Sequence, residues 1–143
     1  MLYASREYTT AVDIWAVGAM FGEMLLGRPM FPGENDIAQI HKISQVRGSI
    51  ANTWPSATRL PDYDKIRFPQ VPKIPLKELL PDVSMDALDL LEQMLHYDPS
   101  QRCSTQDALT HDFFFTDPLP EDNLKDLLMI FQLRRAKKGF ARS

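Results

Sequence analysis

A few charged residues in this chain stand where a folded protein would bury them, and their types suit chemistry or its support. Asp13, Trp15 and Gly18 form the pattern D-x-W-x-x-G at the start of a long apolar segment, and Arg102 stands just before Ser104, a predicted helix cap. A buried carboxylate or guanidinium needs a partner, because an unpaired charge is costly to remove from water. The alternative is that Asp13 favours a helix dipole, that Trp15 and Gly18 pack, and that Arg102 lies on the surface.

The common catalytic and metal-binding motifs are absent from the sequence. It contains neither G-x-G-x-x-G nor G-x-x-x-x-G-K-[ST], which cradle phosphates, and neither H-E-x-x-H nor the G-x-S-x-G elbow. His41, His96 and His111 are far apart in sequence and Cys103 has no cysteine companion, which argues against zinc. Cys103 follows Arg102, but a packed cysteine is more common than a reactive one. We expect no catalytic, cofactor or metal residue in this chain.

The composition is that of an ordinary globular protein. The chain has 143 residues, of which 44% are apolar and 24% charged, and its net charge of -3 lacks the basic excess of a nucleic-acid-binding surface. The longest apolar stretch, residues 14–26, is interrupted by Gly18, Gly22 and Glu23 and is shorter than the ~20 apolar residues of a membrane span. With a single cysteine and no signal-peptide pattern, we expect an intracellular protein of the cytoplasm or nucleus, without nucleic-acid or membrane partners.

Apolar periodicity and capping signals predict a mainly α-helical chain. The first helix is expected over residues 10–26, with Thr10 as its N-cap, Asp13 completing a capping box and Gly27 ending it. This segment is apolar nearly all round, so we expect it to be buried on every side. Its expected stripe comprises Ile14, Val17, Phe21, Met24 and Leu25.

Further helices are predicted after each of three capping signals. Asn35 or Asp36 begins a helix to about residue 46, Ser84 begins one to about residue 96, and Ser104 begins a short one through residue 110. Prolines exclude a long helix in residues 50–82, which we expect to be ordered but irregular. A last helix is expected over 123–136. The predicted inward residues are Ile37, Ile40, Ile43 and Val46, followed by Ala87, Leu88, Leu91, Met94 and Leu95.

Taken together, these segments resemble the C-terminal lobe of a eukaryotic protein kinase. The motif Y-T-T-A-V-D-I-W-A-V-G at residues 8–18 is similar to the start of the F helix, and G-R-P-M-F-P-G at 27–33 is similar to the turn before the G helix. L-x-x-M-L-x-x-D-P-x-x-R at 91–102 and H-D-F-F at 111–114 are similar to the H–I region and the end of the lobe. Asp112 stands where the family usually has proline.

The motifs point to the cyclin-dependent kinase family, and P-D-Y-D-K-I-R-F with L-P-D-V-S-M-D-A-L-D-L-L resembles its cell-cycle-related kinase branch most. The resemblance implies that residues 1–122 form the C-terminal part of a kinase catalytic domain, with the F, G, H and I helices and a Pro-rich insert. Residues 123–143 would be a tail, partly helical with a basic end.

The resemblance also implies roles for the four residues introduced first. Asp13 would hydrogen-bond the backbone of the H-R-D catalytic loop, and Arg102 would pair with the glutamate of A-P-E, which the family pattern places directly before Met1. Trp15 and Gly18 would support the same lobe. We therefore expect Arg102 to be buried near residues 1–4, held by backbone carbonyls or a substitute acid.

The implied parent activity is phosphate transfer from Mg-ATP to Ser or Thr of protein substrates, with a cyclin-like activator or adaptor as a further partner. The Gly-rich loop, the catalytic lysine, H-R-D and D-F-G that perform it are not in this sequence. We expect a scaffold without a complete active site and without a cofactor of its own. One alternative is a non-catalytic binding module that uses the Pro-rich insert and the tail, and another is an unrelated helical bundle.

Overall fold

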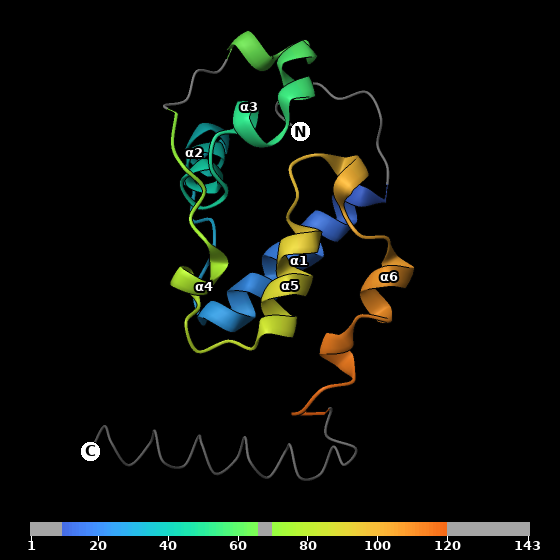
Figure 1. Cartoon of the computed structure of the whole chain (residues 1–143). Helices are drawn as coiled ribbons and strands as arrows, with labels where there is room; N and C mark the ends of the chain where they lie inside the picture. The colour runs from blue at the N-terminus through green and yellow to red at the C-terminus, as the bar shows by residue number, and fades with distance from the viewer. Residues whose placement is uncertain (1–9, 66–69, 120–143) are drawn as a thin grey trace, which may run out of the picture. The chain divides into compact units, whose positions relative to one another are not determined.

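The computed structural model describes residues 10–65 and 70–119, and every regular element in these residues is helical (Figure 1). This confirms the prediction of a mainly α-helical chain. The chain divides into two compact units, Met1–Phe113 and Phe114–Ser143, and the elements that concern the site belong to the first. The helix predicted over 123–136 lies outside the described residues, and the boundary at 122/123 stays a prediction.

The longest helices of the described residues are α1 (Ala11–Leu26), α2 (Asp36–Arg47) and α5 (Met85–Met94). None of the helices in residues 10–65 and 70–119 is long and apolar enough to cross a membrane. Short helical turns connect and follow these three: α3 (Ile50–Thr53), η1 (Pro55–Arg59), η2 (Tyr63–Lys65), α4 (Leu76–Leu79), η3 (Pro99–Gln101), α6 (Thr105–Leu109) and η4 (Asp112–Phe114).

The capping residues begin their helices largely as predicted. The Asn35 and Ser84 side chains each accept a hydrogen bond from the backbone N–H three residues on, at 2.9 and 3.3 Å. Ser104 and Asp107 form a complete reciprocal capping box at the start of α6. Thr10 differs, because its backbone is already helical and its side chain makes no capping bond. The predicted capping box of Thr10 with Asp13 is therefore wrong.

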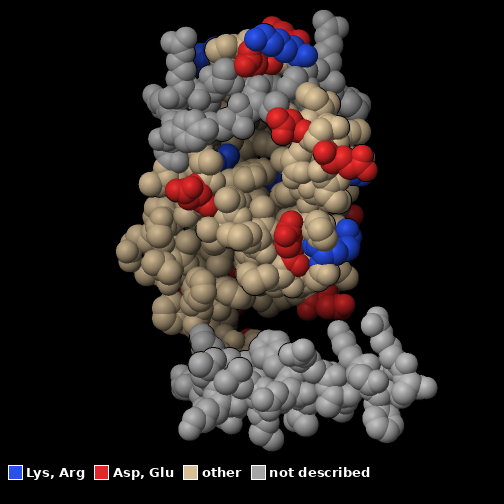
Figure 2. Space-filling model, turned by 180° about the vertical axis from the view of Figure 1, so that it is seen from behind, with Lys and Arg blue, Asp and Glu red and all other residues tan. Residues whose placement is uncertain are grey.

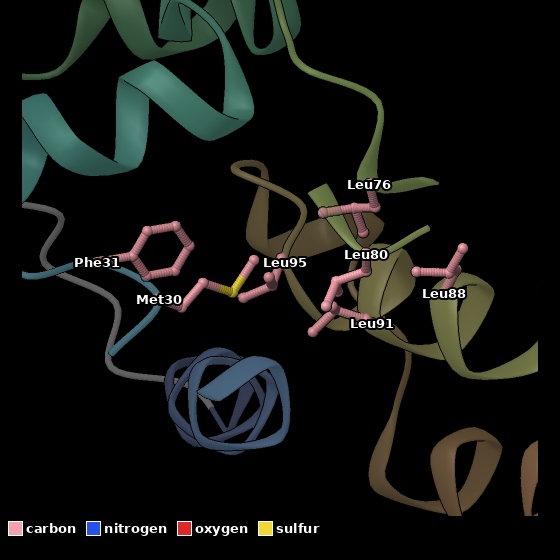
Figure 3. Packing of buried hydrophobic residues seen from close by; sticks show 7 residues of the cluster. All are labelled: Met30, Phe31, Leu76, Leu80, Leu88, Leu91 and Leu95. Carbon is pink, nitrogen blue, oxygen red and sulfur yellow. The ribbon is translucent and has the colours of Figure 1, made fainter. Parts of the chain in front are cut away.

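The core forms where α5 crosses α1. Leu91 and Leu95 are fully buried, and Figure 3 shows Leu95 between Met30 and Leu80, with Leu91 beside Leu80. Buried apolar area is the main stabilising term at such a crossing. The buried cluster consists of Met30, Phe31, Leu76, Leu80, Leu88, Leu91 and Leu95, and Trp15, Ala19, Phe21, Leu25 and Leu26 of α1 are among the half-buried residues packed against it.

Gly18 on α1 makes this close crossing possible. A Cβ at Gly18 would lie 2.7 Å from the Cβ of Met94, closer than side chains approach, and 3.1 Å from a methyl of Leu95. Gly22 instead makes room for the loop after α1, since a Cβ there would collide with the sulfur of Met30. Gly27 ends α1 in the left-handed conformation, with φ of 67°, as predicted.

The opposite face of α1 is exposed, which corrects the prediction of burial on every side. Val17, Met20 and Met24 expose 44%, 57% and 74% of their surface, although Val17 and Met24 were expected in the buried stripe. The reason is tertiary: α5 covers the glycine side, and no other described element covers the far side. Viewed from behind, the molecule carries few charged side chains over much of its surface (Figure 2).

The set of buried residues on α2 also differs from the predicted set. Ile40 is buried and Ile43 is half-buried, as expected, but Ile37 is exposed. Ser44 and Arg47 are buried instead, four and seven residues after Ile40, where a helix presents the same face. The prediction for Ile37 is wrong because the residues of α2 that pack against the main core are Ile43 and Val46, further along the helix.

The Pro-rich insert is irregular, as predicted, in its described parts 50–65 and 70–82. Leu76 and Leu80 of the α4 region fix its second half in the core. Trp54, Leu60 and Tyr63 in its first half are half-buried.

Candidate functional site: an arginine and aromatic cluster beside α1

Trp15 is the centre of an aromatic stack that joins three parts of the chain. Its ring stacks with that of Phe31, at a centroid distance of 6.2 Å and an interplanar angle of 16°, and with that of Tyr97, at 6.0 Å and 19°. The guanidinium carbon of Arg102 lies 5.0 Å from the Trp15 ring centroid. Stacking and cation–π attraction of this kind each contribute about 0.5–1.5 kcal/mol. The indole thus joins α1 to the loop before α2 and to the segment after α5.

The guanidinium of Arg102 donates to backbone carbonyls from all three of its nitrogens. Nε donates to His96 O at 2.7 Å, Nη1 to Ala11 O at 2.7 Å and Nη2 to Tyr97 O at 3.0 Å. These divergent bonds need the planar fork of an arginine. The bond to Ala11 ties the segment after α5 to the first turn of α1.

Arg102 agrees with the prediction in its partners and differs in its burial. Backbone carbonyls hold it, as expected, but its side chain is half-buried rather than buried. Burial lowers the pKa of Arg102, and the charge of Asp98 partly offsets this. An arginine so placed remains a cation, because its ordinary pKa lies far above neutrality. Residues 1–4, its expected neighbours, lie outside the described residues.

Asp13 is exposed, which corrects the expectation that it would be buried. It lies in the first turn of α1, on the side that α5 does not cover, and its N–H donates to Thr10 O at 3.1 Å. A carboxylate here favours the helix dipole. The structure therefore brings Trp15, Gly18 and Arg102 together around the α1–α5 crossing, while Asp13 faces outward from the same end of α1.

A second charged cluster was not predicted from the sequence. Arg47 of α2, only 4% exposed, forms a bidentate pair with Glu92 of α5, at 2.7 and 2.8 Å. Lys73, from the segment before α4, binds the same carboxylate. Fork-to-fork pairing of this type is among the strongest polar contacts in proteins. The cluster therefore fixes α2 and the end of the Pro-rich insert to α5.

The carboxyl group of Glu92 is strongly perturbed by this cluster. Burial alone would raise its pKa, but the hydrogen bonds and charges of Arg47 and Lys73 prevail and lower the pKa of Glu92 to about 2. The burial of Arg47 had a signal in the sequence, because Arg47 lies on the same helical face as Ile40 and Ser44. No local signal identified its partner, because Glu92 lies 45 positions away.

Metal-ligating side chains and the single thiol are the remaining groups of this region that chemistry could use. Within residues 10–65 and 70–119, no group of three His, Cys, Asp or Glu side chains is arranged to hold a metal ion. Cys103 is half-buried, and burial together with Asp107 raises the pKa of its thiol, which disfavours the reactive thiolate.

The sequence matches the protein kinase domain over residues 1–114. The chain belongs to this family, and the helices and the Arg102 cluster described above are elements of that domain. The resemblance predicted from the motifs is thereby confirmed.

Within the family, the similarity is to cyclin-dependent kinases. The chain is 51% identical to cyclin-dependent kinase 20 of Danio rerio and 50% identical to that of Homo sapiens, each over 121 residues, or 84% of this chain and 35% of the relative. It is 47% identical to cyclin-dependent kinase D-1 of Arabidopsis thaliana over 126 residues, 87% of this chain and 31% of the relative. The chain thus spans about a third of the length of the curated relatives it matches.

Replacing Arg102 by lysine tests the carbonyl-binding fork. An ammonium keeps the charge but cannot reach three divergent carbonyls while stacking on Trp15, so we expect Arg102→Lys to lower the free energy of unfolding by about 2–3 kcal/mol. Urea unfolding followed by circular dichroism measures this. The control is Arg59→Lys at an exposed position, which should change stability by less than about 0.5 kcal/mol. Equal stabilities for both variants would contradict the assigned role of the fork.

Acid titration tests the Glu92 cluster. Because the folded pKa of Glu92 lies below its ordinary value, its contribution is complete above about pH 5 and is lost as the pH falls towards about 2. We expect this to remove up to about 3 kcal/mol of stability. Glu92→Gln should abolish that part of the pH dependence, whereas Glu78→Gln, at an exposed position, should preserve it. Unchanged acid sensitivity in Glu92→Gln would show that other groups are responsible.

Proposed function

We propose that this chain is the C-terminal-lobe part of a cyclin-dependent-type protein serine/threonine kinase. The whole enzyme would transfer phosphate from Mg-ATP to Ser or Thr of protein substrates, with a cyclin-like activator or an adaptor as a further partner. The observation that carries this proposal is the kinase-domain match over residues 1–114, together with about 50% identity to cyclin-dependent kinase 20. Because the chain covers a third of such relatives, the activity is proposed for the whole enzyme.

The part of this chain in catalysis would be mechanical support. Asp13, exposed at the start of α1, is free to accept hydrogen bonds from the backbone of a neighbouring catalytic loop. Arg102, already fixed on Trp15 and on three carbonyls, has its charge available to a neighbouring carboxylate, which the family resemblance identifies as the glutamate of A-P-E. Gly18 would support the position of Arg102 indirectly, because it sets the distance between α1 and α5 on which that position depends.

The exposed face of α1 supports the same proposal. Val17, Met20 and Met24 present a stripe of large apolar side chains along one helix. Such contiguous apolar surface usually marks an interaction face. In the proposed enzyme, the remainder of the kinase domain would cover it and complete the burial of α1.

The groups that bind Mg-ATP and transfer phosphate in kinases would come from that remainder. Phosphoryl transfer depends on a nucleotide-covering loop, a lysine, metal-binding acidic and amide groups and a catalytic aspartate held in place. The described residues would supply mechanical support for such groups. We therefore propose that this chain alone neither binds Mg-ATP nor phosphorylates proteins.

A chimera tests the proposal directly. The matching 121 residues of zebrafish cyclin-dependent kinase 20 would be replaced by those of this chain, and phosphate transfer from Mg-ATP to a Ser/Thr peptide would be measured. We expect an active chimera. Asp13→Asn within it should reduce kcat at least about tenfold with little effect on the peptide KM, because support of the catalytic loop acts on the chemical step. Glu34→Gln, at an exposed position on the loop before α2, is the matched control.

The isolated chain completes the experiment. In calorimetric titration with Mg-ATP it should show no saturable binding. Micromolar binding would contradict the proposal that the remainder of the kinase domain supplies the groups that bind Mg-ATP. A well-folded but inactive chimera would contradict the kinase function of this segment and favour a non-catalytic binding module.

A further inference from the structure

The end of the Pro-rich insert has the spacing of a ligand for proline-recognising domains. Residues 71–77 read V-P-K-I-P-L-K, in which two apolar–proline pairs are separated by one residue and a lysine follows the second pair by two positions. Domains of the SH3 type bind such P-x-x-P segments as left-handed polyproline II helices, with pockets for the proline pairs and an acidic pocket for the basic residue.

The backbone here is held extended before any partner binds. The segment before α4 contains no helix, and Pro75 has φ of -57° and ψ of 131°, close to polyproline II. Ser49 N–H donates to Val71 O at 3.0 Å, and Ile74 N–H donates to Val46 O at 3.1 Å. Figure 1 shows this stretch running extended beside α2 into α4. The chain therefore holds residues 71–75 extended, and Leu76 and Lys77 follow in the first turn of α4.

The side chains of the motif divide between those that face the protein and those that face the solvent. Lys73, between the two apolar–proline pairs, binds Glu92, and Leu76, after the second pair, is 5% exposed in the core. These two residues therefore face the protein. Pro72 and Pro75 are exposed, and Ile74 is 37% exposed. The residues that face the protein, Lys73 and Leu76, are those that an SH3 domain would not contact. Of the residues that it would contact, Pro72, Ile74, Pro75 and Lys77 are exposed and Val71 is half-buried.

The basic residue is also accessible. Lys77 is exposed, and its Nζ donates to Val83 O at 3.1 Å. An ammonium has three donors, so this single contact leaves it able to pair with an acidic group of a partner. Ordering such a side chain on binding costs less when one contact already restrains it.

We propose that residues 71–77 form a docking site for an SH3 domain of the class that binds P-x-x-P followed by a basic residue. Two features favour an SH3 domain over other proline-recognising modules: the single-residue separation of the apolar–proline pairs and the lysine after them, without consecutive prolines. The site is remote from the Arg102 cluster in sequence and does not depend on the kinase activity. Its consequence would be recruitment of the chain to SH3-containing proteins.

The test uses the full chain and a set of purified SH3 domains that bind the P-x-x-P-x-K/R orientation. Calorimetry measures affinity, and chemical shifts of the labelled SH3 domain show whether its proline pockets are engaged. We expect saturable binding by at least one domain. The double variant Pro72→Ala/Pro75→Ala should weaken it at least about tenfold, which corresponds to about 1.4 kcal/mol. Lys77→Glu should weaken it to a similar extent.

Two controls separate recognition of the motif from unspecific attraction. Pro61→Ala changes an exposed proline outside the motif and should leave the affinity unchanged. Lys42→Gln removes a charge from an exposed lysine of α2 outside the motif, so it too should bind the SH3 domain with unchanged affinity. Circular dichroism confirms that each variant is folded.

Three results would overturn the proposal. The first is no binding by any domain of the set. The second is equal binding by the wild type and the double proline variant. The third is binding of a peptide of residues 70–78 without binding of the full chain, which would mean that the fold does not present the motif.

Discussion

The close approach of α5 to α1 at Gly18 is the constraint on which the other contacts depend. With any side chain at this position, its Cβ would meet the Cβ of Met94 at 2.7 Å, so the two helices would have to move apart. Their present distance lets Leu91 and Leu95 complete the core. It also brings Arg102, a few residues beyond α5, within hydrogen-bonding distance of α1.

Two cationic clusters then fix α5 in place from different sides. Arg102 joins the segment after α5 to α1 through backbone carbonyls and Trp15, and needs no carboxylate among the described residues. Glu92, on α5 itself, gathers Arg47 and Lys73 and so connects α5 to α2 and to the Pro-rich insert. A kinase lobe needs such rigidity, because phosphoryl transfer depends on groups held in fixed positions. The same contacts hold residues 71–75 extended up to the start of α4.

The sequence predicted what is local and missed what is tertiary. The caps at Asn35, Ser84 and Ser104 follow from hydrogen bonds within a few residues, and these predictions are confirmed. The exposed side of Met24 could not be predicted, because helical periodicity does not say which apolar side is covered when a helix is apolar all round. The partner of Arg47 was equally hidden, since pairing over 45 positions has no local signature.

The most direct test of this account is the stability of Gly18→Ala in urea. Alanine in place of glycine normally stabilises a helix by about 1 kcal/mol, so the sign of the change is diagnostic. We predict a net loss of about 1–2 kcal/mol, because the added methyl group must force α5 away from α1. Ala16→Val, which adds apolar bulk at an exposed position of the same helix, should cost less than about 0.7 kcal/mol. A Gly18→Ala variant as stable as the wild type, or more stable, would contradict the central role of the α1–α5 crossing.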